Sequence, residues 1–116
     1  MKQVLFILLV FISFRGFSQT QTVKLNRIGL EVMKTDLGTM TWEDAVKACK
    51  KLGGDWRLPT KEECKNIHKY KDRIGGFTTE SYWVSYDGDS HYFYSSGDYS
   101  DGKDGTRHVR AVRDLE

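Results

Sequence analysis

The stretch GGDWRLPTKEEC, from Gly53 to Cys64, decides the fold of this chain. It joins two predicted helices. The glycine pair ends the first helix, because glycine readily adopts the left-handed backbone found at helix C-termini, and a second helix begins just after the proline. The connector between them is so short that it must run extended across the core. Residues two apart in an extended segment point to the same side, so we expect Trp56 and Leu58 to be buried together.

The first helix is predicted over TWEDAVKACKKL, residues 41–52. Thr41 can cap the exposed amides at its start, and Asp44 stands at the position that reaches back to the cap. Apolar residues recur along it at spacings of three and four, which is typical of a helix that buries one face. The members of this stripe are Trp42, Ala45, Val46, Cys49 and Leu52.

The second helix begins with a full capping box, in which Thr60 is followed three residues later by Glu63. Strands are predicted over residues 25–33, from partial apolar alternation, and over residues 108–115 at the end of the chain. Between them, SYWVSY and HYFYS read as the two arms of an antiparallel hairpin. The sequence therefore predicts an α+β domain.

The first residues have the pattern of a secretory signal peptide. A lysine at position 2 precedes an unbroken apolar run at residues 4–12, and small residues follow at Gly16 and Ser18. We expect cleavage after Ser18, although cleavage after Thr20 fits nearly as well. The apolar run is shorter than the roughly 20 residues of a membrane-spanning helix, so an uncleaved anchor is the less favoured alternative.

Cleavage of residues 1–18 would leave a polar, flexible leader at 19–24 and a single domain over 25–116. It removes two of the 18 Lys/Arg residues and none of the 16 Asp/Glu residues, so the formal net charge falls from +2 to zero. A neutral chain gives no reason to expect a nucleic-acid partner. Basic residues gather in 47–73 and acidic ones in 81–102, which predicts two solvated faces of opposite sign.

The chain has two cysteines, Cys49 and Cys64. In an exported protein such a pair favours a disulfide, which would stabilise the fold by about 3 kcal/mol through loop-closure entropy. The alternative is a pair of buried thiols that act as small apolar side chains. The spacing is not Cys-x-x-Cys, so a redox-active pair is not predicted. We expect the disulfide.

Four motifs occur in an order that resembles a known family: TWEDA at 41–45, DWRLPT at 55–60, YWVS at 82–85 and VRAVR at 109–113. The order is similar to that of the bacterial DUF1566 family, also called the Lcl C-terminal domain family, which is related to C-type-lectin-like domains. The resemblance covers about residues 25–114, nearly the whole chain after the signal.

This resemblance implies a compact, lectin-like α+β domain, with two helices packed on a twisted antiparallel sheet and a long irregular region before the final strand. It implies a binding module that works outside the cytoplasm. Two features depart from the family pattern. Cys64 stands where an apolar residue is common, and no late cysteine is present to pair with Cys49 in the lectin-like manner. The Glu-Pro-Asn sugar-site signature is also missing, which argues against calcium-dependent sugar binding.

The segment 81–102 contains 18 Ser, Tyr, Asp or Gly residues out of 22. Tyrosine supplies rigid contact area with a polar tip, and Ser, Asp and Gly supply adaptable hydrogen bonds, a mixture typical of evolved binding surfaces. Strand alternation turns about half of the tyrosines inward, and ordinary loop composition is the alternative. We predict that the segment binds a glycan or a protein. The candidate contact residues are Tyr86, Asp87, Asp89, His91, Tyr92, Tyr94, Asp98 and Tyr99.

Metal ligands are weakly indicated. Asp98, Asp101 and Asp104 are spaced three apart among glycines and are candidates for calcium, but the spacing differs from the D-x-[DN]-x-[DN]-G loop and no bidentate glutamate follows. We therefore expect no cofactor, with calcium as the alternative. The histidines lack the paired spacing of zinc ligands: His68, His91 and His108.

Catalysis is not indicated, because the sequence has no Gly-x-Ser-x-Gly elbow, His-Glu-x-x-His helix or phosphate-binding loop. Arg57, Arg110 and Arg113 are predicted to be structural, bonding loop carbonyls or carboxylates. We predict a non-enzymatic binding module that is secreted or located in the periplasm or cell envelope. The alternative is a structural or assembly module of an envelope or secreted complex, in which the same tyrosines contact a partner subunit.

Overall fold

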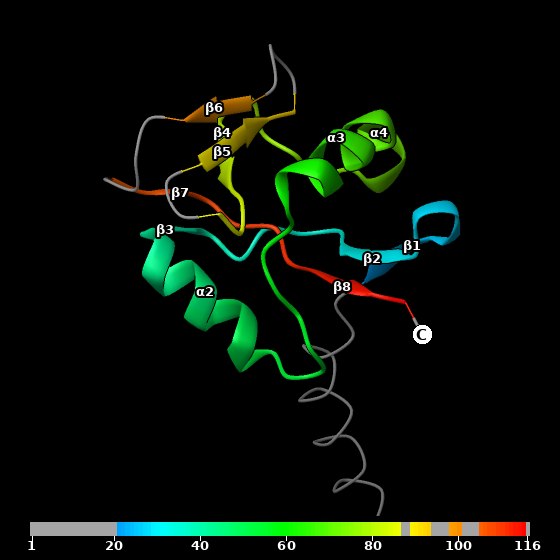
Figure 1. Cartoon of the computed structure of the whole chain (residues 1–116), viewed down its shortest axis with the longest axis horizontal. Coiled ribbons are helices and arrows are strands. Elements are labelled where there is room, and N and C mark those ends of the chain that lie inside the picture. The colour runs from blue at the N-terminus through cyan, green and yellow to red at the C-terminus, as the bar shows by residue number, and fades with distance from the viewer. Residues whose placement is uncertain (1–20, 87–88, 94–97, 101–104, 116) are drawn as a thin grey trace, which may run out of the picture.

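The computed structural model describes residues 21–86, 89–93, 98–100 and 105–115, and for residues 89, 92 and 98–100 it describes the backbone alone. These residues form an α+β fold (Figure 1). None of the helices in this part of the chain has the length and apolar character needed to cross a membrane. The helices are η1 (Asn26–Ile28, a 3-10 turn), α2 (Trp42–Lys51), α3 (Lys61–Lys69) and α4 (Lys71–Ile74). The strands are β1 (Thr22–Leu25), β2 (Leu30–Met33), β3 (Thr39–Met40), β4 (Ser81–Trp83), β5 (Asp89–Tyr92), β6 (Asp98–Ser100), β7 (Arg107–His108) and β8 (Val112–Asp114).

The described strands form two sheets. In the first, β2 lies between β1 and β8 and pairs antiparallel with both. The second has the order β3-β7-β4-β5-β6, in which β4 and β7 are parallel and the other neighbours antiparallel. The last segment of the chain supplies β7 to one sheet and β8 to the other, and Figure 1 shows it crossing the molecule between them. The predicted hairpin is present as the β4–β5 pair, but its second arm begins at Asp89 and not at His91 as expected.

Both long helices begin where their capping patterns predict. The hydroxyl of Thr41 accepts a hydrogen bond from the N–H of Asp44 at 3.2 Å, and that of Thr60 accepts one from the N–H of Glu63 at 3.0 Å. The Glu63 carboxylate accepts from the Thr60 N–H at 2.9 Å, which completes the capping box. The glycine pair at 53–54 ends α2 with φ angles of +76° and +60°, a conformation that favours glycine.

The connector is extended, as predicted. Arg57 exchanges both of its backbone hydrogen bonds with Val112, each 2.8 Å long, so the connector lies antiparallel against the start of β8. Trp56 is 8% exposed and Leu58 is 3% exposed, and both belong to the same apolar cluster. The expectation that these two side chains are buried on one side is confirmed.

The buried apolar side chains form two clusters. We call them the α3-side core and the α2-side core, after the helices that contribute to them. Tyr82 and Val112 belong to the first, whereas their chain neighbours Trp83 and Ala111 belong to the second, because successive strand residues point to opposite faces. The α3-side core contains Leu25, Leu30, Val32, Cys64, Ile67, Ile74, Phe77, Tyr82, Val84, Phe93 and Val112. The α2-side core contains Met33, Ala45, Cys49, Trp56, Leu58, Trp83, Val109 and Ala111.

Two predicted strands are divided in the structure. Residues 25–33 are interrupted by η1 and by Gly29, whose φ of +66° turns the chain so that β1 and β2 pair as a hairpin. Residues 22–24, expected in the flexible leader, are therefore part of β1. The strand expected over 108–115 is split between β7 and β8, which belong to different sheets. Each break is only a few residues long and still contains an apolar residue, Ile28 in the first and Val109 in the second, so partial alternation alone does not show the breaks.

The expected disulfide is absent. Neither cysteine is disulfide-bonded, and both are fully buried. Cys49 packs in the α2-side core and Cys64 in the α3-side core, so the central layer of the fold separates the two side chains. Each cysteine therefore fills space as a small apolar residue. Burial also raises the pKa of the Cys49 thiol to about 11.

This arrangement predicts two alkylatable thiols. Iodoacetamide applied in denaturant without reductant should add two carbamidomethyl groups to the intact mass, because both cysteines carry thiols. In the folded protein Cys49 should resist the reagent, because little of it is thiolate near neutral pH. A chain that takes up the reagent only after reduction would instead establish the disulfide.

Candidate functional site

The side chain of Tyr86 is strongly exposed, and the two residues before it, which we call its base, are held by hydrogen bonds. Its side chain is 71% exposed. Just before it, the carbonyl of Val84 accepts a hydrogen bond from Trp42 Nε1 at 2.9 Å, and the N–H of Ser85 donates to the carbonyl of Pro59 at 2.7 Å. Trp42 is the first residue of α2, and Pro59 precedes the cap of α3. Two hydrogen bonds thus attach the base of Tyr86 to the N-terminal ends of both long helices.

Four other predicted contact residues lie on adjacent strands at the end of the five-stranded sheet. Their backbones are brought together by the antiparallel pairing of β5 and β6. These residues are Asp89 and Tyr92 on β5, and Asp98 and Tyr99 on β6. Asp87 and Tyr94 lie outside the described residues. The sheet therefore groups the backbones of four predicted contact residues at one edge, on strands that follow the exposed Tyr86 in the chain.

His91, by contrast, is buried and does not lie on the surface as predicted. Its side chain is 2% exposed and its ring packs 4.6 Å from that of Phe93. His91 Nε2 lies 3.0 Å from His68 Nδ1, so β5 is bonded to α3 through two imidazole rings. Such a bond needs one protonated and one unprotonated nitrogen. Burial, followed by the charge of Lys71, lowers the pKa of His68 below its usual range.

The histidine pair predicts that acid destabilises the fold. Because the pKa of His68 is lower in the folded chain than its ordinary value of 6.5, the unfolded chain binds more protons as the pH falls through that value, and stability is lost. The free energy of unfolding, measured with urea, should therefore be lower at about pH 5.5 than at about pH 7.5. His68→Gln should lose less stability over the same interval, since glutamine does not titrate. An equal loss in both proteins would show that the titration of His68 is not the cause of the lost stability.

The three histidines do not form a common metal site. His68 and His91 are neighbours, whereas His108 lies beside Tyr82, with ring centroids 5.3 Å apart, and near Asp36. Within the described residues, no group of three His, Cys, Asp or Glu side chains is arranged to hold a metal. Of the calcium candidates, Asp101 and Asp104 lie outside those residues, and Asp98 is described by its backbone alone.

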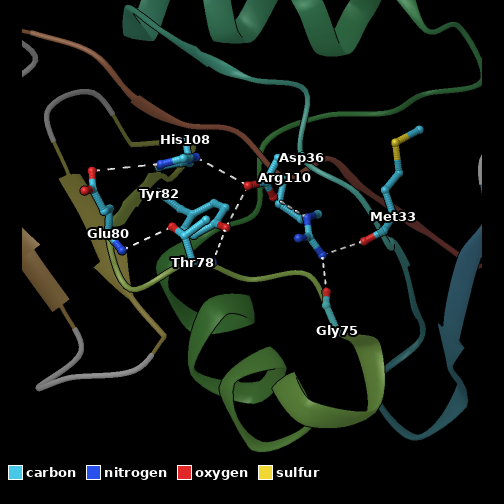
Figure 2. Close-up of polar contacts among 8 residues, drawn as sticks. All are labelled: Met33, Asp36, Gly75, Thr78, Glu80, Tyr82, His108 and Arg110. Carbon is cyan, nitrogen blue, oxygen red and sulfur yellow. Dashed lines mark hydrogen bonds and ion pairs between the residues drawn. The ribbon is translucent and has the colours of Figure 1, made fainter.

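Asp36 is the centre of a largely buried polar cluster (Figure 2). Its Oδ1 accepts a hydrogen bond from Arg110 Nε at 2.7 Å, and its Oδ2 accepts one from the Tyr82 hydroxyl at 2.8 Å. His108 Nδ1 lies 3.4 Å from the same Oδ2. Three residues from the second half of the chain thus converge on one carboxylate in the turn after β2.

Arg110 is 2% exposed and links two further segments. One terminal nitrogen donates to the carbonyls of Met33 and Gly75, both at 3.0 Å, and the guanidinium lies 4.0 Å from the centroid of the Phe77 ring. The other terminal nitrogen is buried with no hydrogen-bond partner in the described structure. A buried guanidinium is costly without a partner of opposite charge, so its pairing with Asp36 is essential. The predicted structural role of Arg110 is confirmed.

Tyr82 completes this cluster as a donor. Its hydroxyl accepts a hydrogen bond from the N–H of Thr78 at 2.9 Å and donates to Asp36. Burial raises the pKa of Tyr82, which keeps the hydroxyl protonated near neutral pH. Both oxygens of the Asp36 carboxylate are bonded by protein groups, which fits a structural role. Asp36 is not among the residues singled out from the sequence, because no spacing rule relates it to a residue 74 positions later.

Removing the carboxylate should strongly destabilise the protein. In Asp36→Ala the Arg110 charge stays buried without its partner, and we expect the free energy of unfolding to fall by about 3 kcal/mol or more. Urea unfolding measures this change. The matched control is Asp72→Ala, at an exposed position on α4, which should change stability by less than about 0.5 kcal/mol. Similar effects of the two substitutions would show that the Asp36–Arg110 pair contributes little to stability.

Arg57 is the centre of a second ion-pair network. Its guanidinium donates to both oxygens of Glu63 at 2.8 Å and to Asp114 Oδ1 at 2.7 Å. Burial alone would raise the pKa of Glu63, but hydrogen bonds from Arg57 and from the N–H of Thr60 hold it below its usual value. The Glu63 that caps α3 is thus also the partner of the connector arginine. This confirms the structural prediction for Arg57.

A cleft of about 1080 Å³ adjoins this network. Arg113 forms part of its wall: its guanidinium lies 4.5 Å from the centroid of the Trp56 ring, and its Nε donates to Glu31 at 2.9 Å. Sequence reasoning missed the cleft, because its walls come from four distant parts of the chain. Its lining consists of Lys24, Glu31, Trp42, Val46, Lys50, Ser85, Arg113, Asp114, Leu115 and residues 54–58.

Comparison with known proteins adds no assignment: the chain matches neither a family model nor a curated protein sequence. The resemblance to the DUF1566 family therefore stays a prediction that depends on the four motifs. The structure places these motifs at the start of α2, in the connector, on and after β4, and along the last segment.

Proposed function

We propose that this chain is a non-catalytic binding module that works outside the cytoplasm, either secreted or in the periplasm or cell envelope. The observation that carries the proposal is Tyr86, which is 71% exposed on a base bonded to both long helices. A large aromatic side chain with few rotatable bonds loses little entropy when a ligand covers it. Placed on a fixed base, it is well suited to be a contact residue.

The partner we propose is a glycan or a protein. Tyr86 lies within the segment 81–102, which is rich in Tyr, Ser, Asp and Gly and whose strands β5 and β6 carry four more predicted contact residues at the sheet edge. Aromatic rings with hydroxyl and carboxylate neighbours can pack on a sugar ring or a peptide and bond its polar groups. The signal-like residues 1–18 support the proposed location.

The topology we propose is C-type-lectin-like. The observed α+β architecture supports it, with two capped helices and a terminal segment that joins both sheets. The order of the four motifs also supports it, since each lies in a structured part of the chain. The Tyr-rich segment lies in the long region before the last segment of the chain, where the resemblance implies irregular structure.

Alanine substitution tests the Tyr-rich surface. The purified protein is screened against a glycan array and a panel of envelope proteins, with and without calcium. Tyr86→Ala, Tyr92→Ala, Tyr94→Ala and Tyr99→Ala should together lower the affinity for any partner found by at least about tenfold, as expected for aromatic contact residues. Lys47→Ala, at an exposed position on α2, is the control and should leave the affinity unchanged.

Unchanged binding in the tyrosine variants would refute the proposed surface. A stable complex with an envelope protein, formed through the same tyrosines, would identify the assembly module instead. Excess chelator tests for calcium in the fold: a lower melting temperature in chelator would show that the folded protein holds this ion, and an unchanged one would show that it does not. Whether binding depends on calcium is read from the screen run with and without it.

A further inference from the structure

We propose that the cleft beside the connector binds a short neutral saccharide, at a site separate from the Tyr86 surface. Its volume, about 1080 Å³, is just above the roughly 300–1,000 Å³ usual for small-molecule sites. None of the predicted contact residues of the Tyr-rich segment is among its lining residues in the described structure. The inference therefore goes beyond the proposed function and does not require it.

An aromatic wall supplies the apolar contact. Trp42 lines the cleft, and its Nε1 is bonded to the carbonyl of Val84, which fixes the orientation of the indole ring. Val46 stands one turn further along the same face of α2 and also lines the cleft. One face of a sugar ring consists of C–H groups, which pack favourably against an aromatic ring. The wall is therefore suited to a flat, partly apolar ring.

Ion pairs supply the polar contacts. Arg57 is held by Glu63 and Asp114, and Arg113 by Glu31, so donors and acceptors stand side by side in fixed orientations. The side chain of Asp114 is 78% exposed, which leaves it open to a ligand. A sugar hydroxyl both donates and accepts hydrogen bonds. Neighbouring hydroxyls on a sugar ring can therefore bond a guanidinium and its carboxylate together.

The charge balance of the cleft favours a neutral ligand over an ion. Four basic residues line it (Lys24, Lys50, Arg57 and Arg113), as do three acidic ones (Glu31, Asp55 and Asp114). Glu63, bonded to Arg57, makes the balance four to four. A charged ligand would lose hydration without meeting an excess of the opposite charge. A neutral, polyhydroxylated molecule loses less hydration, and hydrogen bonds to the ion pairs can offset that loss.

Calorimetric titration of the purified chain with defined oligosaccharides tests the inference. The neutral probes are the tetrasaccharides of cellulose, starch, laminarin, chitin and mannan, and the charged probes are hyaluronan and heparin tetrasaccharides. At least one neutral probe should bind, with an affinity that neither chelator nor added salt changes, since no metal and no net charge is involved. The charged probes should bind more weakly.

Variants locate the site. Trp42→Ala should lower the affinity for the neutral probe by at least about tenfold, whereas Trp42→Phe, which keeps an aromatic ring, should change it by less than about threefold. Lys47→Ala, on the same helix but outside the cleft lining, and Tyr86→Ala should have no effect. Asp114→Asn is a second test that spares the core, because this side chain is exposed, and it should weaken binding.

Three results would overturn the inference: no binding of any neutral probe, binding of charged probes only, or neutral binding that survives Trp42→Ala and Asp114→Asn in folded protein. Neutral binding lost with Tyr86→Ala would assign the sugar to the proposed Tyr-rich surface instead. Conversely, tyrosine variants that bind all other partners normally would refute the Tyr-rich surface. If saccharide binding in the cleft persists in the same variants, the cleft site remains supported.

Discussion

Arg57 is the residue on which the arrangement of the elements depends most. Its backbone pairs with Val112 in both directions, and its side chain bonds Glu63 and Asp114. One residue thus joins the connector, the cap of α3 and the last strand. Because the connector is extended, the side chains on either side of Arg57 point the other way, into the α2-side core. Burial on one face and ion pairing on the other fix the position of the connector.

The Arg110–Asp36 pair has the corresponding role at the centre of the molecule. It lies where the last segment passes from the five-stranded sheet to the three-stranded one, and it bonds the turn after β2 and the loop after α4 to that segment. Together, Arg57 and Arg110 account for how strands so short can form a stable layer. The short strands have few ladder hydrogen bonds, and guanidinium groups with several donors connect the irregular segments between them.

The features predicted correctly from the sequence are those that depend on residues close together in the chain. Caps at Thr41 and Thr60, the glycine stop and the burial of Trp56 and Leu58 all depend on residues within a few positions of each other, and all are confirmed. Features that depend on distant packing were missed or wrong. The disulfide was expected because spacing cannot show that two cores separate the thiols. His91 was assigned to the surface because composition does not show that α3 covers it, and Asp36 and the cleft are assembled from residues far apart in sequence.

Trp42 connects the two candidate surfaces. Its Nε1 holds the carbonyl of Val84 and so fixes the base of Tyr86, while its ring lines the cleft, where Ser85 is a neighbour. A ligand that moved the indole ring would therefore also disturb the hydrogen bond beneath Tyr86. Coupling between the surfaces needs such a physical link, because a ligand shifts an equilibrium only through contacts that differ between two states. Phenylalanine at this position keeps the ring and removes the N–H donor, so it separates the contribution of Trp42 to the cleft from its support of Tyr86.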